Sequence, residues 1–411
     1  MLFRSLGDRY YEFNYRLIWW PRETYKGLSW QRIRDGLADP KQRGQFWDVV
    51  IHRRYSTPTA QWDPVHRFSL FVKKDVAAKV WDWGAPTGTI TTTGAAAPAD
   101  PYKGGERKLT AIKQLGATGA AGTAAGQFSY PRAVAVDAEG KVYVADTGNH
   151  RIQVFNADGA FLRQFGSLCK LDTKQGCQGD GGGQFNEPWG IAVGADGSIY
   201  VSDTWNHRIH KFDKDGKFVK MWGVFESTGG ELGKANAFYG PRSLAIGDDG
   251  NLYAMDTGNK RVQVFSPDGV FVNQFGGGGL TDGRFDEPTG IGQDGAGAWY
   301  VADAWNRRIQ KFDKTYKYVE QWPIDGWASQ SVVNKPALAV DKARNIVYVT
   351  DPENYRVIAF NTDGSFRAFF GQYGNDAQSF VLPVGIAVGP DGKVYVADGD
   401  AHRIMVFAAL Q

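Results

Sequence analysis

A unit of 47 to 57 residues that occurs six times constrains the fold of this chain more than any other feature. Each copy runs from a Pro through an apolar segment and a Gly-containing turn to a Tyr-centred segment that ends in Asp. Asn-x-Arg, a second apolar segment and another turn follow. Repeats of this length indicate an architecture in which each copy is one supersecondary unit. The marker prolines are Pro131, Pro188, Pro241, Pro288, Pro336 and Pro383.

Each copy is expected to form four short strands, because β-branched and aromatic residues alternate with Asp-Gly and similar turns. One such sheet alone would leave its faces and edges in solvent, whereas six sheets packed around an axis bury them. The sequence therefore predicts an all-β, six-bladed β-propeller over residues 108–411. The clearest strand segments are Val142–Asp146, Ile199–Asp203, Leu252–Asp256, Trp299–Asp303, Val347–Asp351 and Val394–Asp398.

The last repeat ends near Phe407 and has room for only three strands. Residues 111–116 (Ala-Ile-Lys-Gln-Leu-Gly) match the fourth-strand pattern of residues 161–166 (Phe-Leu-Arg-Gln-Phe-Gly). We therefore expect this N-terminal strand to complete the last blade, because closure removes an open sheet edge.

The residues before the propeller differ in composition. Residues 1–84 contain seven of the 14 Trp and are expected to form a small α/β segment. Its strands are predicted at Tyr10–Trp20 and Arg67–Val72, and its helices near Trp30–Leu37, Lys41–Arg54 and Asp75–Trp83. Residues 85–107 are rich in Gly, Ala, Thr and Pro, which is typical of a flexible linker. A packed core and a membrane-interface surface are both open interpretations of the aromatic density.

The pattern Asp-x-x-Asn-x-Arg-Ile/Val between two strands, repeated in phase, resembles the NHL repeat family over residues 108–411. The resemblance implies the propeller fold. The copies depart from the pattern at Ala401, which replaces Asn, and at Pro352-Glu353. The stretch from Tyr55–Pro58 to Phe71–Asp75 resembles the soluble tail of bacterial multi-span glycosyltransferase-like membrane proteins. That second resemblance implies a membrane association through sequence upstream of Met1.

The repeated polar residues are interpreted as structural, because six-fold repetition is what a fold requires and an active site does not. The Asp caps turn amides, the Asn tolerates left-handed backbone, and the Arg bonds carbonyls or the Asp. The set comprises Asp146, Asn149, Arg151, Asp203, Asn206, Arg208, Asp256, Asn259, Arg261, Asp303, Asn306, Arg308, Asp351, Asn354, Arg356, Asp398 and Arg403.

A ligand-binding face is expected where the loop between the second and third strands meets the start of the first strand. Residues that vary between copies on this face combine indole rings with guanidinium groups, which suit the recognition of a protein or a glycan. An alternative is that the Trp side chains pack against neighbouring loops. The candidates are Arg132, Trp189, Trp205, Arg242, Trp305 and Arg307.

Catalytic machinery is not apparent: the chain has no nucleophile elbow, Walker loop, paired metal motif or dinucleotide fingerprint. We expect no catalytic residue, metal or cofactor in the ring. His150, His207 and His402 share one repeat position, and related propellers such as the amidating lyases use a central metal. Solvated turn residues are the preferred interpretation. A propeller lyase or hydrolase with a metal in the central channel is the alternative function.

The charge distribution disfavours nucleic acid as a partner. Residues 1–105 hold 16 Lys and Arg against 10 Asp and Glu, whereas the rest of the chain holds 31 against 34. A slightly acidic ring lacks the cations that neutralise phosphates. RNA binding by an NHL domain remains an alternative, with Arg132, Arg242, Lys260 and Arg307 as its candidate contacts.

The two Cys of the chain, Cys169 and Cys177, both lie in a Gly-rich insertion between the first and second copies. A disulfide that closes this short loop is expected, which implies an oxidising, extracytoplasmic location. The sequence thus predicts a non-catalytic, extracytoplasmic binding or scaffold propeller.

Overall fold

The computed structural model describes residues 2–6, 10–15, 68–73, 100–116, 119–327, 331 and 334–410. The chain divides into two compact units, residues 1–98 and 99–411. In the first unit an antiparallel sheet has the order β1-β2-β3, with β1 at Leu2–Leu6, β2 at Tyr10–Tyr15 and β3 at Phe68–Lys73. Two of these strands lie where strands were predicted. The three predicted helices lie outside the described residues.

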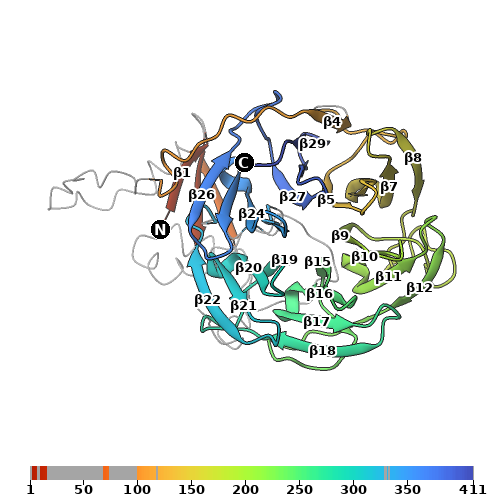
Figure 1. Cartoon of the computed structure of the whole chain (residues 1–411). Coiled ribbons are helices and arrows are strands. Elements are labelled where there is room, and N and C mark those ends of the chain that lie inside the picture. Colours follow the sequence, from red (N-terminus) through yellow and green to blue (C-terminus); the bar gives the residue numbers. More distant parts are fainter. Residues whose placement is uncertain are drawn as a thin grey trace. The chain divides into compact units, whose positions relative to one another are not determined.

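The second unit is a ring of six four-stranded antiparallel sheets, which confirms the predicted six-bladed propeller (Figure 1). Blade 1 consists of β5 (Pro131–Val136), β6 (Val142–Asp146), β7 (Arg151–Phe155) and β8 (Phe161–Phe165). Blade 2 consists of β9 (Pro188–Val193), β10 (Ile199–Asp203), β11 (Arg208–Phe212) and β12 (Phe218–Trp222). Blade 3 consists of β15 (Pro241–Ile246), β16 (Leu252–Asp256), β17 (Arg261–Phe265) and β18 (Phe271–Gly276). Short strands β13 (Val224–Phe225) and β14 (Ala237–Phe238) pair between blades 2 and 3.

Blades 4 to 6 repeat this order from the axis outward. Blade 4 consists of β19 (Pro288–Gln293), β20 (Trp299–Asp303), β21 (Arg308–Phe312) and β22 (Tyr318–Pro323). Blade 5 consists of β23 (Leu338–Asp341), β24 (Ile346–Asp351), β25 (Arg356–Asn361) and β26 (Phe366–Phe370). Blade 6 consists of β27 (Pro383–Val388), β28 (Val394–Asp398), β29 (Arg403–Phe407) and β4 (Lys113–Gly116).

Strand β4 closes the ring, as predicted. It pairs antiparallel with β29, and the register places Leu115 opposite Ile404. Leu115 is buried in a cluster with Phe128 and Val144, so the closing strand also joins blade 6 to blade 1. Pairing with β4 satisfies the edge of β29 that the last repeat would otherwise leave open.

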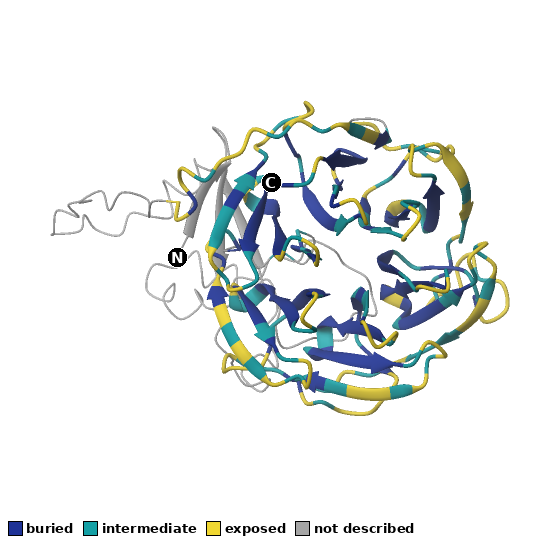
Figure 2. Ribbon diagram, in the orientation of Figure 1, coloured by how far each residue is buried: buried dark blue, intermediate teal, exposed yellow. Residues whose placement is uncertain are grey.

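The core lies between neighbouring blades, where burial is continuous (Figure 2). Tyr143 and Ile152 of blade 1 pack in one cluster with Ile191 and Val201 of blade 2. Each fully buried apolar side chain of this size stabilises the fold by about 1.5–3 kcal/mol. The second strand of every blade is buried along its whole length, because both of its faces contact a neighbouring blade.

Residues 100–107, at the end of the segment assigned to a linker, lie against blade 5. Tyr102 is buried against Phe360 and Phe366, and Asp100 forms an ion pair with Arg356 at 2.5 Å. The amide N–H of Arg107 donates to the carbonyl oxygen of Phe369.

Candidate functional site

In each blade the repeated Asp holds the turn between the second and third strands, which lies on the predicted ligand-binding face. In blade 1, Asp146 Oδ1 accepts the amide N–H of Ser129 at 2.7 Å, and Oδ2 accepts Asn149 Nδ2 at 2.9 Å and Arg151 Nε at 2.7 Å. Arg151 also donates to the carbonyl oxygens of Thr123, Ala124 and Gln127 in the loop that enters the blade. Buried charge-assisted bonds of this kind hold loop and turn together.

The Arg-to-Asp contact recurs in all six blades, with Nε to Oδ2 distances of 2.7 to 3.0 Å. The blades differ in how the rest of the network is completed. In blade 6, where Ala401 replaces Asn, Asp398 Oδ1 accepts two backbone N–H groups, from Val381 and Leu382. In blade 5, Asp100 accepts the outer donors of Arg356.

The left-handed residue of each turn is not the Asn, as was predicted, but the residue after that position. His150 has φ 53° and ψ 40°, and it follows the short 3-10 turn η3 (Thr147–Asn149). Asn149 instead uses its amide to donate to Asp146 and to the Gly122 carbonyl oxygen.

The three repeat-position histidines join neighbouring blades. The Nδ1 atom of His150 accepts the amide N–H of Glu187 at 3.1 Å, that of His207 accepts Gly240 at 3.0 Å, and that of His402 accepts Tyr130 at 3.1 Å. Burial lowers the pKa of His207 to about 4, because a protonated ring would lose this acceptor and its solvation. The three residues lie in turns, as expected, but the His150 and His207 side chains are half-buried and that of His402 is buried.

Glycines let the innermost strands approach one another around the axis. A Cβ on Gly190 would lie 1.8 Å from the carbonyl oxygen of Arg242, and one on Gly385 would lie 2.4 Å from that of Arg132. Ser202 Oγ donates to the same Arg242 oxygen at 2.6 Å. These contacts fix the backbone of the two arginines that were predicted to bind a ligand.

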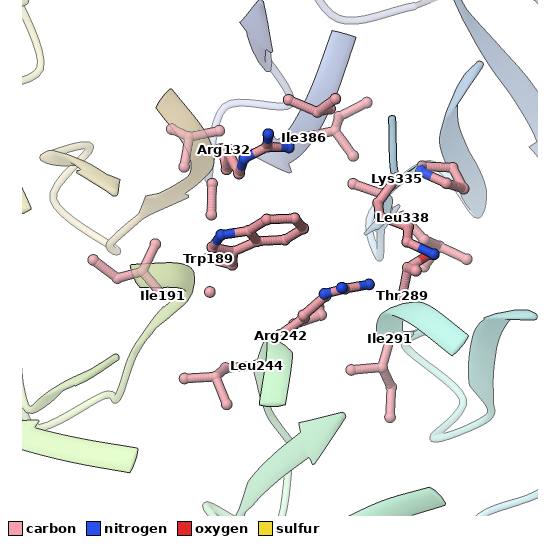
Figure 3. A pocket seen from close by; sticks show the side chains of 18 residues that line it. Arg132, Trp189, Ile191, Arg242, Leu244, Thr289, Ile291, Lys335, Leu338 and Ile386 are labelled. Carbon is pink, nitrogen blue, oxygen red and sulfur yellow. The ribbon is translucent and has the colours of Figure 1, made fainter. Parts of the chain in front are cut away.

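An axial pocket of about 90 Å³ opens at the start of the innermost strands (Figure 3). Its wall contains two rings with one residue from each blade. The outer ring lies on the face that carries the turns between second and third strands, because Pro131 at the start of β5 pairs with Asp146 at the end of β6. The outer ring consists of Arg132, Trp189, Arg242, Thr289, Pro336 and Val384, and the inner ring of Val134, Ile191, Leu244, Ile291, Leu338 and Ile386.

The indole of Trp189 lies between two guanidinium groups in the outer ring (Figure 3). The Cζ atom of Arg132 is 4.1 Å from the ring centroid and that of Arg242 is 4.5 Å from it. Cation–π contacts of this kind are worth up to about 2 kcal/mol when desolvated. The edge of Trp189 meets the ring of Trp205, which is 40% exposed. Four of the six predicted residues thus form one contiguous surface.

Two glutamates and a lysine complete this surface. Glu287 contacts Arg242 at 3.0 Å and Lys335 at 2.9 Å, and Glu187 accepts the indole N–H groups of Trp205 and Trp189 at 2.9 and 3.4 Å. Lys335 also lies 4.6 Å from the ring centroid of Trp305, which brings the fifth predicted residue to the pocket rim.

The charged side chains that line the pocket are all cations. Arg132, Arg242 and Lys335 line it, whereas no Asp or Glu is among the described lining residues. Burial and the repulsion of Arg242 lower the pKa of Arg132 to about 10. Burial alone would raise the pKa of Glu287, but Lys335 and Arg242 hold it below its usual range.

Glu187, Glu287 and Lys335 were not among the residues predicted from the sequence. Each directly precedes a marker proline, so position in the repeat was a usable signal. Glu187 and Glu287 have positive φ angles of 57° and 51°, where the equivalent residue of blade 3 is Gly240. Tyr130 of blade 1 also has a positive φ, of 48°, at this repeat position, so the conformation belongs to the turn that enters the first strand.

Arg307, the sixth predicted residue, is not among the residues that line the pocket. Its side chain is 48% exposed, and Nη2 contacts Asp325 Oδ1 at 3.8 Å. Lys260, at the same repeat position in blade 3, pairs with Asp286 at 3.0 Å.

Cys169 and Cys177 form a disulfide, as predicted. The loop that contains it supplies acceptors for blade 2: the Cys169 carbonyl oxygen accepts Asn206 Nδ2 at 2.7 Å, and the Asp180 carbonyl oxygen accepts Arg208 Nη1 at 2.8 Å. Across the described residues, no group of three or more His, Cys, Asp or Glu side chains is arranged to hold a metal.

Comparisons with known proteins identify the repeats. The NHL repeat model matches residues 128–155, 185–212, 238–265 and 380–407. NHL repeat-containing protein 3 of Mus musculus is 31% identical over 196 residues, which cover 46% of this chain and 54% of that protein. A probable peptidyl-alpha-hydroxyglycine alpha-amidating lyase of Caenorhabditis elegans is 30% identical over 169 residues, which cover 41% of this chain and 42% of that protein.

Among solved structures, a gluconolactonase from Xanthomonas campestris has a TM-score of 0.49 at 13% identity, with 74% of this chain and 98% of that chain covered. The chain spans about half the length of the two relatives above. It contains NHL repeats that form a six-bladed β-propeller.

Proposed function

We propose that this propeller is a binding module that recognises an acidic segment of a partner protein at the axial pocket and on the adjoining Trp189–Trp205 surface. The observation on which this proposal rests is the stack of Arg132, Trp189 and Arg242 at the mouth of a pocket that is lined by cations. Guanidinium groups held in place by an aromatic ring are pre-organised for carboxylates, since little side-chain entropy is lost on binding.

A protein partner is favoured over a glycan because the indole faces are already covered. Guanidinium groups lie on Trp189 at 4.1 and 4.5 Å, and Lys335 lies over Trp305. Stacking on a sugar ring needs a free indole face. Trp205 is the most exposed of the three and offers contact area to a peptide at the rim.

The test measures binding of fluorescent (Glu)8 and (Gln)8 peptides to the full chain by anisotropy. We expect (Glu)8 to bind more tightly, and Arg132→Gln to weaken it about tenfold, as expected for loss of a hydrogen bond to a charged group. Arg307→Gln is the matched control, because it removes one cation from the same face outside the pocket. Equal binding of the two peptides, or equal effects of the two variants, would contradict the proposal.

A glycan array probed with the same protein tests the rival ligand class. Glycan binding that Trp205→Ala abolishes and Arg132→Gln leaves unchanged would favour a sugar ligand on the exposed indole. Acidic-peptide binding without glycan binding supports the proposal.

The disulfide supports an extracytoplasmic location, since such bonds persist in oxidising compartments. Within the described residues, no helix has the length and apolarity needed to span a membrane. The resemblance of the N-terminal residues to the tail of a glycosyltransferase-like membrane protein stays a prediction, because the matched NHL repeats lie within residues 128–407.

The amidating-lyase relative makes an enzyme the second candidate function. The described residues that line the axial pocket include no His, Cys, Asp or Glu, so they do not fit a bound metal ion of the kind that the sequence analysis considered. The RNA alternative is weakened because Lys260 and Arg307, two of its four candidate contacts, each contact a carboxylate of the ring itself.

A further inference from the structure

Two polar atoms in the wall of the axial pocket have no hydrogen-bond partner among the described residues. They are Thr289 Oγ1 and Arg242 Nε. Thr289 is 5% exposed and Arg242 is 6% exposed, and both residues line the pocket. A buried donor without an acceptor costs about 1–3 kcal/mol, so both atoms are expected to be satisfied by something that enters the pocket.

The charges in the wall point to an anion. Arg132, Arg242 and Lys335 line the pocket, whereas the carboxylates that act on them, Glu287 on Arg242 and Lys335 and Glu187 and Asp400 on Arg132, are not lining residues. A group that enters the pocket therefore meets cations and the two unsatisfied polar atoms, which suits an anion that accepts hydrogen bonds.

The inner ring of aliphatic residues strengthens such an interaction. Ile191, Leu244 and Ile291, with their counterparts in the other blades, form the wall next to the cations. Charges interact more strongly beside apolar side chains than in water. A volume of about 90 Å³ has room for a small acid group or several water molecules.

We propose that the axial pocket is a binding site for a carboxylate group, which accepts hydrogen bonds from Thr289 Oγ1 and Arg242 Nε and pairs with the cationic rim. The carboxylate site names the chemical group that the proposed partner would place in the pocket. It rests on the proposed function only in that the ligand enters from the same face. A planar carboxylate matches the flat fork of donors on a guanidinium. The carboxylate of Glu287 already contacts Arg242 and Lys335 together.

The test titrates the full chain with sodium acetate at constant ionic strength and measures binding by calorimetry. We expect saturable binding of one acetate per chain with a dissociation constant of about 1 mM, since a ligand with so few atoms has a low ceiling of affinity. Sodium phosphate and sodium chloride are the comparison probes. We expect both to bind at least tenfold more weakly than acetate.

Three variants locate the site. Thr289→Val keeps the shape of the side chain and is expected to weaken acetate binding about fivefold, as loss of one neutral hydrogen bond implies. Arg242→Lys keeps the charge but removes Nε, and is expected to weaken binding about tenfold. Arg307→Gln is expected to leave acetate binding unchanged. Thermal unfolding of each variant shows whether it is folded.

Four results would overturn the carboxylate site: no saturable acetate binding, phosphate or chloride binding as tight as acetate, no effect of Thr289→Val, or an equal effect of Arg307→Gln. Failure of (Glu)8 binding with intact acetate binding would refute the proposed partner and leave the site standing. Intact (Glu)8 binding without acetate binding would refute the site alone.

Discussion

Contacts between neighbouring blades make this propeller sensitive to acid, and His207 is the histidine for which the size of the effect can be worked out. Its Nδ1 atom accepts the Gly240 N–H, so the ring must be neutral there. The pKa is about 6.5 in the unfolded chain and about 4 in the folded one. The folded state therefore binds fewer protons, and stability is lost as the pH falls below 6.5 toward 4.

The magnitude follows from the shift in pKa. Each unit is worth about 1.36 kcal/mol, so the whole effect is about 3 kcal/mol, of which about 2 kcal/mol falls between pH 7 and pH 5. Few carboxylates titrate in that window. The pKa values of His150 and His402 are also lowered by burial, so the wild-type protein should lose still more.

The assay is urea denaturation of the full chain at pH 7 and pH 5, followed by circular dichroism. His207→Asn keeps a residue that tolerates left-handed backbone and removes the titrating ring. We expect it to cost about 1 kcal/mol at pH 7, through the lost bond to Gly240, and to shrink the loss between pH 7 and pH 5 by about 2 kcal/mol. Lys260→Asn, at the same turn position in blade 3, is the control without an imidazole. Equal losses of unfolding free energy by the wild-type and His207→Asn proteins between the two pH values would show that protonation of His207 does not destabilise the ring.

Three further predictions concern the ring itself. Gly190→Ala should destabilise the protein by about 3 kcal/mol in urea denaturation, because the new Cβ meets the Arg242 carbonyl oxygen, whereas Gly295→Ala, whose nearest contact is 3.3 Å away, should have a small effect. Reduction of the Cys169–Cys177 disulfide should cost about 2–3 kcal/mol, the loop-closure value for so short a loop; an unchanged denaturation midpoint with dithiothreitol would contradict this. Deletion of residues 108–116 should leave the edge of β29 unpaired and cause aggregation, which light scattering detects; a monomeric, folded product would show that β4 is dispensable.

The sequence was sufficient for the fold because every blade repeats the same local pattern. The Tyr-centred strands, the Asp-Gly turns and the match of residues 111–116 to a fourth strand each identify their position independently. Closure by β4 followed from counting strands. Positions 132, 189, 205, 242 and 305 could be placed on one face, because the repeat puts equivalent residues at the same level along the propeller axis.

Contacts between blades could not be predicted in the same way. Glu287 meets Arg242 and Lys335 only because three neighbouring blades converge on the axis. The repeat pattern shows where a residue lies along its strand. It does not show toward which residue of a neighbouring blade the side chain points. Composition likewise assigned Asp100 and Tyr102 to a linker, although their contacts with blade 5 depend on single side chains.

The pairing of β4 with β29 has a consequence for biosynthesis. Gln114 and Arg403, which are bonded across this pair, lie 289 residues apart in the chain. At ribosomal rates of about 5–20 residues per second, the first strand waits roughly 15–60 s for its partner. Its exposed edge must avoid other nascent chains during that delay, so the cell's chaperones have a defined period in which to protect it.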